Sequence, residues 1–243
     1  MKKLFLALTI IFIGSTLMDV FAIPVLVNIK ESLTGHFSYF NYTFKGEVLE
    51  LYAVWENIGS VTCDTYFMVK AYDSLNTSLG YFWSEKVNAP PGKAANFKLY
   101  VFIPNYNGSI TLIPRLYYCN EIEDYSSLTI EKYNSTFMHP LPLNITYELY
   151  PDKIVFLFNE SLKKEIYVVP VKQPPGWIIP STAAPVFSKQ VAVSYYRPKN
   201  SYKSLNFYFT DGYSGRAITV YFKDEWEKES LWQKLLSFLK KLF

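Results

Sequence analysis

Cysteine and histidine are scarce in this chain of 243 residues, which contains two of each. Zinc sites are built from sets of Cys and His ligands at short spacings, whereas His36 and His139 each stand alone in a polar or proline-flanked segment. A Gly-x-Ser-x-Gly turn, which presents the nucleophile of many hydrolases, is also missing. The sequence therefore offers no catalytic residues, no metal ligands and no cofactor site, and it predicts a protein that is not an enzyme.

Acidic residues suggest two further chemistries that the sequence does not favour. Glu121, Glu123 and Asp124 lie close together and have the oxygen ligands that calcium prefers, but a solvated loop explains them more simply. A glycosidase needs two acids at a fixed separation in an aromatic cleft, and no such pair stands out. Neither chemistry is therefore assigned to a residue.

Excess charge of one sign is absent as well. The formal net charge is +3, and it becomes +2 once the N-terminal leader described below is removed. No Lys/Arg-rich run appears before the last turns of the chain, so there is no field to attract nucleic acid, and we exclude that partner. Only three Gln accompany 21 Lys, a bias typical of a thermophile or of an AT-rich genome.

Asn-x-Ser/Thr sequons, in contrast, are abundant. The chain has 14 Asn and 34 Ser plus Thr, from which chance pairing gives about two sequons. Six are present, and all lie in the first two-thirds of the chain: Asn41, Asn76, Asn107, Asn134, Asn144 and Asn159. This excess predicts a glycoprotein that passes through a secretory membrane.

The N-terminus predicts the same route. Lys2 and Lys3 precede an apolar run over 4–18, and Val20-Phe21-Ala22 has the small-x-small pattern of a signal-peptidase site. We therefore predict a cleaved signal peptide over 1–22 and an extracellular or cell-surface protein. The alternative is an uncleaved anchor, because the chain is again apolar over 23–29.

The mature chain has a hydrophobic period of two, which is typical of strands with one buried face. In the segment 49–56, Leu49, Leu51, Ala53 and Trp55 share one face, so Trp55 is predicted to anchor a core. Further strands are expected at 62–72, 81–87, 95–103 and 109–119. The turns between them include Asn57-Ile58-Gly59-Ser60 and Ala89-Pro90-Pro91-Gly92. Short strands at this spacing predict an antiparallel β-sandwich over 23–138.

These turns, followed by a long strand that opens at Gly108 and ends near Asn120-Glu121, resemble the CARDB and related fibronectin-like sandwich domains of archaeal and bacterial surface proteins. The similarity covers residues 25–130, about half of the chain. It implies an extracellular spacer, adhesion unit or binding module.

The two cysteines flank strands of this predicted sandwich. If the strands alternate in direction, Cys63 and Cys119 lie at the same end, where an oxidising compartment would preserve a disulfide. The apolar phase of the last strand places Cys119 on the other face, unless Pro114 marks a bulge. The alternative is two inert buried thiols.

The strand pattern restarts after an expected linker over 133–142. A hairpin is predicted from strands at 145–149 and 154–158, followed by strands at 165–171, 186–196, 204–210 and 216–222. The proline-rich stretch 173–185 is expected to be an extended loop. We predict a second small β-sandwich over 139–223, and infer that its sequon-free surface after Ser161 contacts another surface.

The last residues change to a helical period. An amphipathic helix is predicted over 224–243, with acids in its first turns and Lys240 and Lys241 in its last. Its apolar stripe comprises Leu231, Trp232, Leu235, Leu236, Phe238, Leu239, Leu242 and Phe243. The stripe could pack on its own sandwich, on a second helix, or on a membrane surface as a peripheral contact. Its length and charges exclude a membrane span.

Together these features predict a non-catalytic secreted or cell-surface protein that acts in structure or adhesion, through assembly with other surface proteins or with itself. The alternative function is carbohydrate binding, because sugars stack on exposed aromatic rings. Trp83 and Trp177 are the candidate platform, since Trp55 is assigned to the core. The competing interpretation is that both rings cap the sandwich cores.

Overall fold

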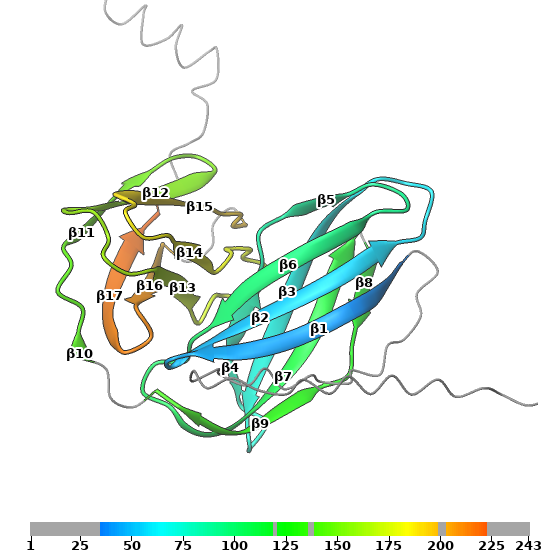
Figure 1. Ribbon diagram of the computed structural model, residues 1–243, viewed down its shortest axis with the longest axis horizontal. Coiled ribbons are helices and arrows are strands. Elements are labelled where there is room, and N and C mark those ends of the chain that lie inside the picture. The colour runs from blue at the N-terminus through cyan, green and yellow to red at the C-terminus, as the bar shows by residue number, and fades with distance from the viewer. Residues whose placement is uncertain (1–34, 119–120, 136–138, 199–202, 223–243) are drawn as a thin grey trace, which may run out of the picture.

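The computed structural model describes residues 35–118, 121–135, 139–198 and 203–222 (Figure 1). These residues form seventeen strands and no helix, which confirms the all-β prediction. The predicted signal peptide, 1–22, and the predicted helix, 224–243, lie outside the described residues. Within the part of the chain that is described, no helix has the length and apolarity to span a membrane.

The first half of the structure, residues 35–135, consists of two facing sheets around one core. One sheet has the strand order β1 (Gly35–Lys45), β2 (Val48–Asn57) and β6 (Ala94–Val101). The other has the order β4 (Ser78–Trp83), β3 (Cys63–Asp73), β7 (Asn107–Tyr118) and β8 (Glu121–Asp124). β5 (Val87–Ala89) pairs with β3, and β9 (Leu128–Asn134) pairs with β7.

Alternation of side chains explains this packing. In β2 every second residue is buried, and Trp55 is fully buried against the ring of Tyr118, with centroids 5.4 Å apart. This confirms that Trp55 anchors the core. β1 was not expected, because a bulge between Phe37 and Tyr39 interrupts its alternation and hides the period of two.

Pro114 does not create a bulge, contrary to the possibility raised by its position. The β3–β7 register is continuous from Thr65↔Tyr118 to Asp73↔Ile110. The Pro114 carbonyl accepts a hydrogen bond from the Tyr125 N–H, between the end of β8 and the start of β9. The N–H and C=O groups of one strand residue point toward the same neighbouring strand. At Pro114 that side is the gap between β8 and β9, so the missing N–H costs no ladder hydrogen bond and the proline is tolerated.

The second half, residues 139–222, also has two sheets. The larger has the order β10 (His139–Pro140), β17 (Ser214–Tyr221), β16 (Ser204–Thr210), β13 (Ile166–Val171) and β14 (Thr182–Ala184). The smaller is β11 (Ile145–Leu149), β12 (Lys153–Phe158) and β15 (Gln190–Ser194). β11 and β12 form the predicted hairpin. A second core lies between these sheets, with Phe156 packed on Phe207 and Phe209.

Three segments differ from the sequence-based expectations, and the first is Glu121–Asp124, which was expected to be a solvated loop and is strand β8. The expected linker begins too early, since Tyr133 lies in β9, belongs to the first core and is fully buried. The expected strand 186–196 is shortened to β15, because Phe187 adopts a φ of 70° and is 81% exposed in a turn. β10 and β17 are a parallel pair among otherwise antiparallel ladders.

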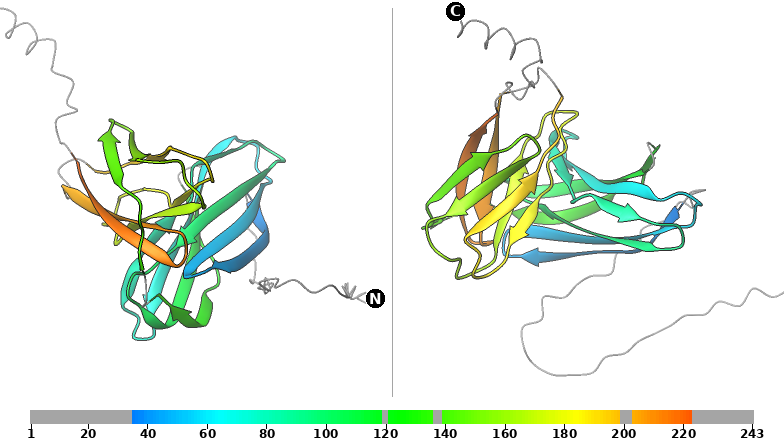
Figure 2. Two further views of the ribbon diagram at one scale, coloured as in Figure 1. Left: turned by 60° about the vertical axis from the view of Figure 1, so that its left-hand side comes forward. Right: turned by 90° about the horizontal axis from the view of Figure 1, so that it is seen from above.

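The two halves lie side by side. Figure 1 shows β13, β14 and β16 next to one end of the first sandwich, and the right-hand view of Figure 2 shows the strands of the two halves running in different directions. Tyr167 and Val169 of β13 pack into the first core, although they belong to the second half in sequence. Ile166 and Val168 belong to the second core, so β13 contributes side chains to both cores.

Candidate functional site

All six sequon asparagines lie within the described residues. Five have exposed side chains, and Asn41, in the middle of β1, is half-buried. N-linked sugars need an accessible side-chain amide and extend into solvent. The surface is therefore compatible with glycans at each predicted position: Asn41, Asn76, Asn107, Asn134, Asn144 and Asn159.

Four of the sequon asparagines form two spatial pairs. Asn107 at the start of β7 lies directly opposite Asn134 at the end of β9. Asn144 and Asn159 are joined by two hydrogen bonds of 3.1 Å, from the Asn144 N–H to Asn159 Oδ1 and from the Asn159 N–H to the Asn144 carbonyl. Sequons far apart in the chain thus place candidate glycans beside one another.

A cleft of about 300 Å³ borders the Asn144–Asn159 pair. Its apolar lining includes Leu143 and Leu162, and its polar rim includes an ion pair of 3.2 Å between Lys164 Nζ and Asp211. Burial acts to raise the pKa of Asp211, but hydrogen bonds from the N–H groups of Ser214 and Tyr213, together with Lys164, outweigh it and lower that pKa. The Asp211 carboxylate therefore holds the backbone of its own turn, between β16 and β17.

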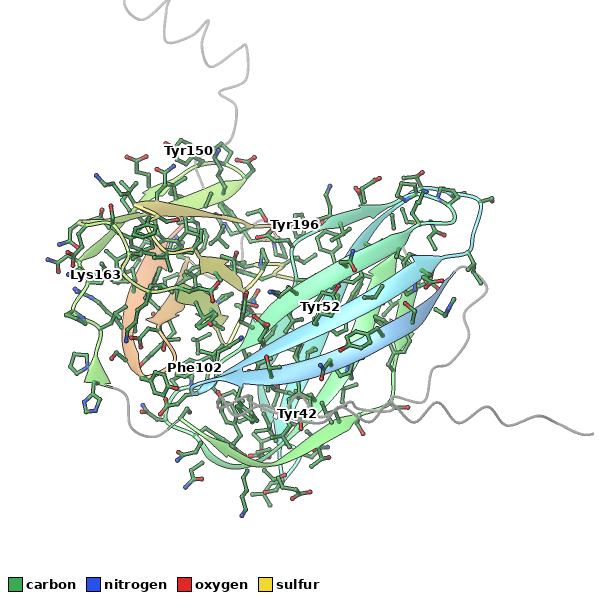
Figure 3. The ribbon with its side chains drawn as sticks, viewed as in Figure 1. Tyr42, Tyr52, Phe102, Tyr150, Lys163 and Tyr196 are labelled. Atoms are coloured by element: carbon green, nitrogen blue, oxygen red, sulfur yellow. The ribbon has the colours of Figure 1, made fainter. Side chains whose placement is uncertain are left out.

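Asn41 occupies a different environment, on the outer face of the β1–β2–β6 sheet. Its direct partner on β2 is Tyr52, and Tyr39 lies two residues earlier on β1. The rings of Tyr39 and Tyr52 are 5.8 Å apart, and Figure 3 shows Tyr52 on β2 away from the junction of the two halves. Asn41 is the sequon asparagine with two aromatic neighbours on its own face.

The junction between the halves is built by residues 173–184, which we call the junction segment. Ser181 is 2% exposed; its hydroxyl accepts a hydrogen bond of 2.7 Å from the Tyr100 N–H on β6, and its N–H donates to the Trp83 carbonyl on β4 at 2.9 Å. β4 and β6 are edge strands of the two sheets of the first half. Ser181 thus satisfies one backbone group on β4 and one on β6, at sheet edges that would otherwise be open to pairing with another chain.

Gln173 strengthens the same junction. Its side-chain amide donates to the carbonyls of Tyr81 (3.2 Å) and Ile179 (2.9 Å) and accepts from the Ile179 N–H (3.0 Å). The Gln173 side chain is 3% exposed; its two bonds with Ile179 are buried, and its bond to Tyr81 is partly buried. The proline-rich stretch that was expected to be an extended loop is therefore ordered against the first half.

Two glycines close the other end of the junction. The N–H of Glu47, in the β1–β2 turn, donates to the Gly212 carbonyl in the β16–β17 turn at 2.8 Å. Gly46 has a φ of 63° and Gly212 a φ of 91°, and a Cβ on either would overlap the backbone of the opposite turn. Glycine is therefore required for the two turns to approach.

Aromatic rings fill the space between these polar contacts. Tyr100 packs on Tyr167 and Phe102 on Tyr208, each pair with centroids 4.9 Å apart. Figure 3 shows Phe102 where the two halves meet. Burial, followed by the nearby Glu50 and Glu165 carboxylates, raises the pKa of Tyr100, so its ring stays neutral over the physiological range.

Two carboxylates at the junction have pKa values raised above that of an ordinary glutamate. Burial raises the pKa of Glu47, whose Oε2 is shielded from solvent and has no hydrogen-bond partner. Burial also raises the pKa of Glu85, which is partly offset by a hydrogen bond of 3.2 Å from the Ser194 hydroxyl. Both groups are therefore easier to protonate than an exposed glutamate.

The predicted tryptophan platform is wrong. Trp83 is 6% exposed, because Tyr66 and Tyr117 cover its ring and Pro180 bridges to its backbone. Trp177 is 1% exposed and packs edge-on against Phe222. Neither ring presents a face to a sugar, so both belong to the packing of the junction and the second core.

The scarce cysteines and histidines also have defined positions. Cys63 is 4% exposed at the start of β3, and the part of the chain that is described contains no free cysteine. Cys119 lies outside the described residues, so its pairing with Cys63 stays a prediction. His36 Nε2 faces Glu56 across β1 and β2 at 3.7 Å, and His139 is exposed in β10. Within the described ranges, no group of three or more His, Cys, Asp or Glu is arranged to hold a metal ion.

Sequence reasoning did not identify the junction. Ser181 and Gln173 carry no local signal, because their partners on β4 and β6 are roughly 80 to 100 residues away. Glycines at turns were visible, but the approach of Gly46 to Gly212 was not. The pairing of sequons was likewise hidden, since it depends on the register of β7 with β9 and on contacts between β11 and β12.

No protein-family model matches the chain, and no curated protein matches it. Solved structures with some similarity include red sea bream transglutaminase, at 11% identity and a TM-score of 0.26 over 81% of this chain and 31% of that chain. A two-domain fibronectin type III segment of chicken tenascin aligns at 11% identity and 0.23, covering 82% and 98%. The chicken interferon gamma receptor alpha chain aligns at 9% identity and 0.22, covering 84% and 99%. The chain spans under a third of the transglutaminase, and these TM-scores are too low to carry an argument about fold or function.

Proposed function

We propose that this chain is a non-catalytic, glycosylated extracellular or cell-surface protein that serves as a rigid structural or adhesion unit through protein–protein assembly. The observation that carries the proposal is the junction, where the buried side chains of Ser181 and Gln173 hydrogen-bond to β6 and β4, one edge strand of each sheet of the first half. A unit that transmits position or force between partners needs such a stiff connection, whereas relative motion is the default for loosely joined domains.

The strand order supports two immunoglobulin- or fibronectin-like domains. In the first half, β1–β2–β6 opposes a sheet in which β3 and β7 are central. In chain order this corresponds to strands A, B and E facing C, F and G, the arrangement of immunoglobulin-type sandwiches. The second core, with its own pair of sheets, supports a second small sandwich.

The surface supports a secretory route. Five sequon asparagines are exposed, and Asn41 lies on an outer sheet face. The predicted signal peptide and a Cys63–Cys119 disulfide belong to the same proposal, because the first directs export from the cytoplasm and the second persists in an oxidising compartment.

A contact surface is proposed on the second half. Large apolar side chains are exposed there after Ser161, where the chain has no sequon: Val186, Phe187, Tyr196, Tyr213 and Tyr221. Tyrosine and phenylalanine are enriched in protein interfaces, and neighbouring glycans would block such contacts. The predicted helix over 224–243 is the second proposed docking element.

The proposal is tested by expressing the full chain in a secretory host with N-glycosylation. We expect the medium to contain a protein that begins at Ile23 and loses mass when an endoglycosidase removes its glycans. Light scattering of this protein should show an oligomer, and a version that ends at Ser230 should be a soluble monomer. Retention in the cytoplasm without glycans would overturn the secretory assignment, and a monomeric full chain would exclude self-assembly.

A further inference from the structure

Residues two apart on a strand share a face, and on β1 this rule brings a sequon together with an aromatic ring. The bulge between Phe37 and Tyr39 turns Phe37 and Phe40 inward and leaves Tyr39 48% exposed. Tyr39, Asn41 and Thr43 therefore line up along the outer face. Tyr52 lies directly across from Asn41 on β2.

The Asn41 amide is already oriented toward Tyr39. Asn41 Oδ1 accepts a hydrogen bond of 2.8 Å from the Tyr42 N–H, which fixes the amide plane. Nδ2, the atom that carries an N-linked sugar, donates to the Tyr39 hydroxyl at 3.0 Å. Nδ2 has two hydrogens, so a sugar can replace one while the other keeps this contact.

The surrounding groups suit a sugar ring. The rings of Tyr39 and Tyr52 contact each other edge to face, with centroids 5.8 Å apart at 62°, so a sugar would stack on the exposed side of the pair and not between the rings. The Tyr52 hydroxyl donates to Asn96 Oδ1 at 2.8 Å, which holds that ring in place, and the Lys98–Glu50 ion pair of 3.5 Å lies beside it. Aromatic faces with a polar rim are how proteins bind the apolar faces and hydroxyls of a pyranose.

The other sequons lack this arrangement. The residues two positions before them are Ser74, Asn105, Lys132, Pro142 and Leu157, none of which is aromatic. Asn41 also lies on an edge strand of its sheet, whereas the opposite edge, β6, is covered by the junction segment. A glycan held over β1 would shield that edge from pairing with another chain.

We propose that Tyr39 and Tyr52 form a built-in binding site for the first sugars of the glycan on Asn41, which locks this glycan onto the sheet. The inference rests on the proposed function, because it requires a glycosylated protein. It adds a ligand class, an N-linked pyranose, and two residues that bind it.

The test is a thermodynamic cycle on the full chain, secreted from a host whose N-glycans begin with N-acetylglucosamine. Thr43→Val removes the sequon at Asn41 and leaves Asn41, Tyr39 and Tyr52 unchanged. Tyr39→Ala and Tyr52→Ala are each made with Thr43 and with Thr43→Val. Mass spectrometry of glycopeptides identifies the preparations in which Asn41 carries its glycan. Denaturant unfolding is then measured for every variant.

We expect each tyrosine substitution to increase the unfolding equilibrium constant about three- to tenfold more when the glycan is present than when it is absent, the range for one stacking contact. Tyr150→Ala, at an exposed tyrosine in the β11–β12 turn, is the control and should show no such coupling.

Equal effects in both backgrounds would overturn the inference, as would an empty Asn41 in a protein glycosylated at its other sequons; the proposed function survives both results. A protein without any glycan would overturn the proposed function as well. Binding of a free N-acetylglucosamine disaccharide to the Thr43→Val protein, abolished by Tyr52→Ala, would instead assign the tyrosine pair to an external sugar and overturn the inference.

Discussion

At the scale of single residues, buried polar side chains determine how loops and halves are held. Asn57 is 1% exposed; its amide donates to the Val61 and Ala89 carbonyls at 2.8 and 2.7 Å, and its Oδ1 accepts from the Gly59 N–H. Ser135 bonds the Ile103 carbonyl, and the Tyr133 hydroxyl donates to the Glu47 carbonyl at 2.9 Å. Each satisfies backbone groups that strands leave unpaired, which would otherwise carry a desolvation cost.

Glu47 is the residue whose titration should be visible in the stability of the fold. Burial raises the pKa of its carboxyl in the folded state, so its contribution to stability is complete below the unfolded-state pKa and is lost as pH rises through the folded-state value. We expect the unfolding free energy of the natural protein, relative to Glu47→Gln, to fall as pH rises from about 4 to about 7. Denaturant unfolding at several pH values measures this difference.

Lys86 and Asp64 provide the control for this experiment. The hydrogen bond from Lys86 lowers the pKa of Asp64, so Asp64→Asn should give the opposite trend, with the natural protein gaining relative stability as pH rises. Because Asp64 is exposed, that effect should be small. A Glu47→Gln difference that does not change with pH would show that Glu47 is solvated.

At the scale of elements, turns and edges are positioned by what they contact. Pro114 lies in a central strand at the gap between β8 and β9, and Pro170 lies in β13 beyond the last residue that pairs with β14. Proline is tolerated at both positions because no neighbour requires its N–H. The β1–β2 turn is similarly adapted, since Gly46 faces Gly212 across the junction.

A comparison of Gly46 with Gly92 distinguishes the cost of backbone strain from the cost of a steric overlap. Their φ angles are 63° and 68°, but a Cβ at Gly92 meets nothing within 4 Å, whereas one at Gly46 overlaps the Gly212 carbonyl. We expect Gly92→Ala to destabilise the protein by about 1 kcal/mol through strain alone. Gly46→Ala should cost about 2–4 kcal/mol, because the turns must also separate.

Thermal and denaturant unfolding of the two glycine variants measure these costs. The comparison is direct because both substitutions add one methyl group at nearly the same φ. Equal losses for Gly46→Ala and Gly92→Ala would show that the approach of the two turns contributes nothing to stability.

At the scale of the whole molecule, the two halves share packing and hydrogen bonds. Tyr167 and Val169 from β13 join the first core, and the junction segment covers the edges of β4 and β6. Because each half completes the other, we expect a single unfolding transition. Calorimetry, with fluorescence and circular dichroism on the same samples, tests this, and two resolved transitions would contradict it.

Gln173 is the side chain through which this coupling can be weakened. Gln173→Ala leaves buried backbone groups of Ile179 and Tyr81 without partners, and we expect a loss of about 2–4 kcal/mol. Gln190→Ala, at an exposed position at the start of β15, is the matched control and should change stability by less than about 0.5 kcal/mol. Equal effects of the two substitutions would show that the junction bonds are dispensable.

Local patterns predicted most of the regular structure. Alternation along 49–56 and 204–210 identified β2 and β16, and the hairpin of β11 and β12 followed from two alternating runs around Tyr150-Pro151-Asp152-Lys153. The strands that were missed include β1, β8, β9, β10 and β14. A bulge breaks the period in β1, β8 was expected to be a solvated loop, and β14 has three residues within a proline-rich stretch. The tryptophan platform failed for a related reason, since periodicity does not show which residues from other strands or loops cover a ring.

The all-β class, the inward position of Trp55 and the six sequons follow directly from the amino-acid sequence, because each depends on neighbouring residues along one strand or triplet. The tertiary structure decided the burial of Trp83 and Trp177, the pairing of Asn144 with Asn159, and the sealing of two sheet edges by Ser181. Those features depend on groups brought together from distant segments, and their free energy comes from desolvating and pairing atoms that are not neighbours in the chain.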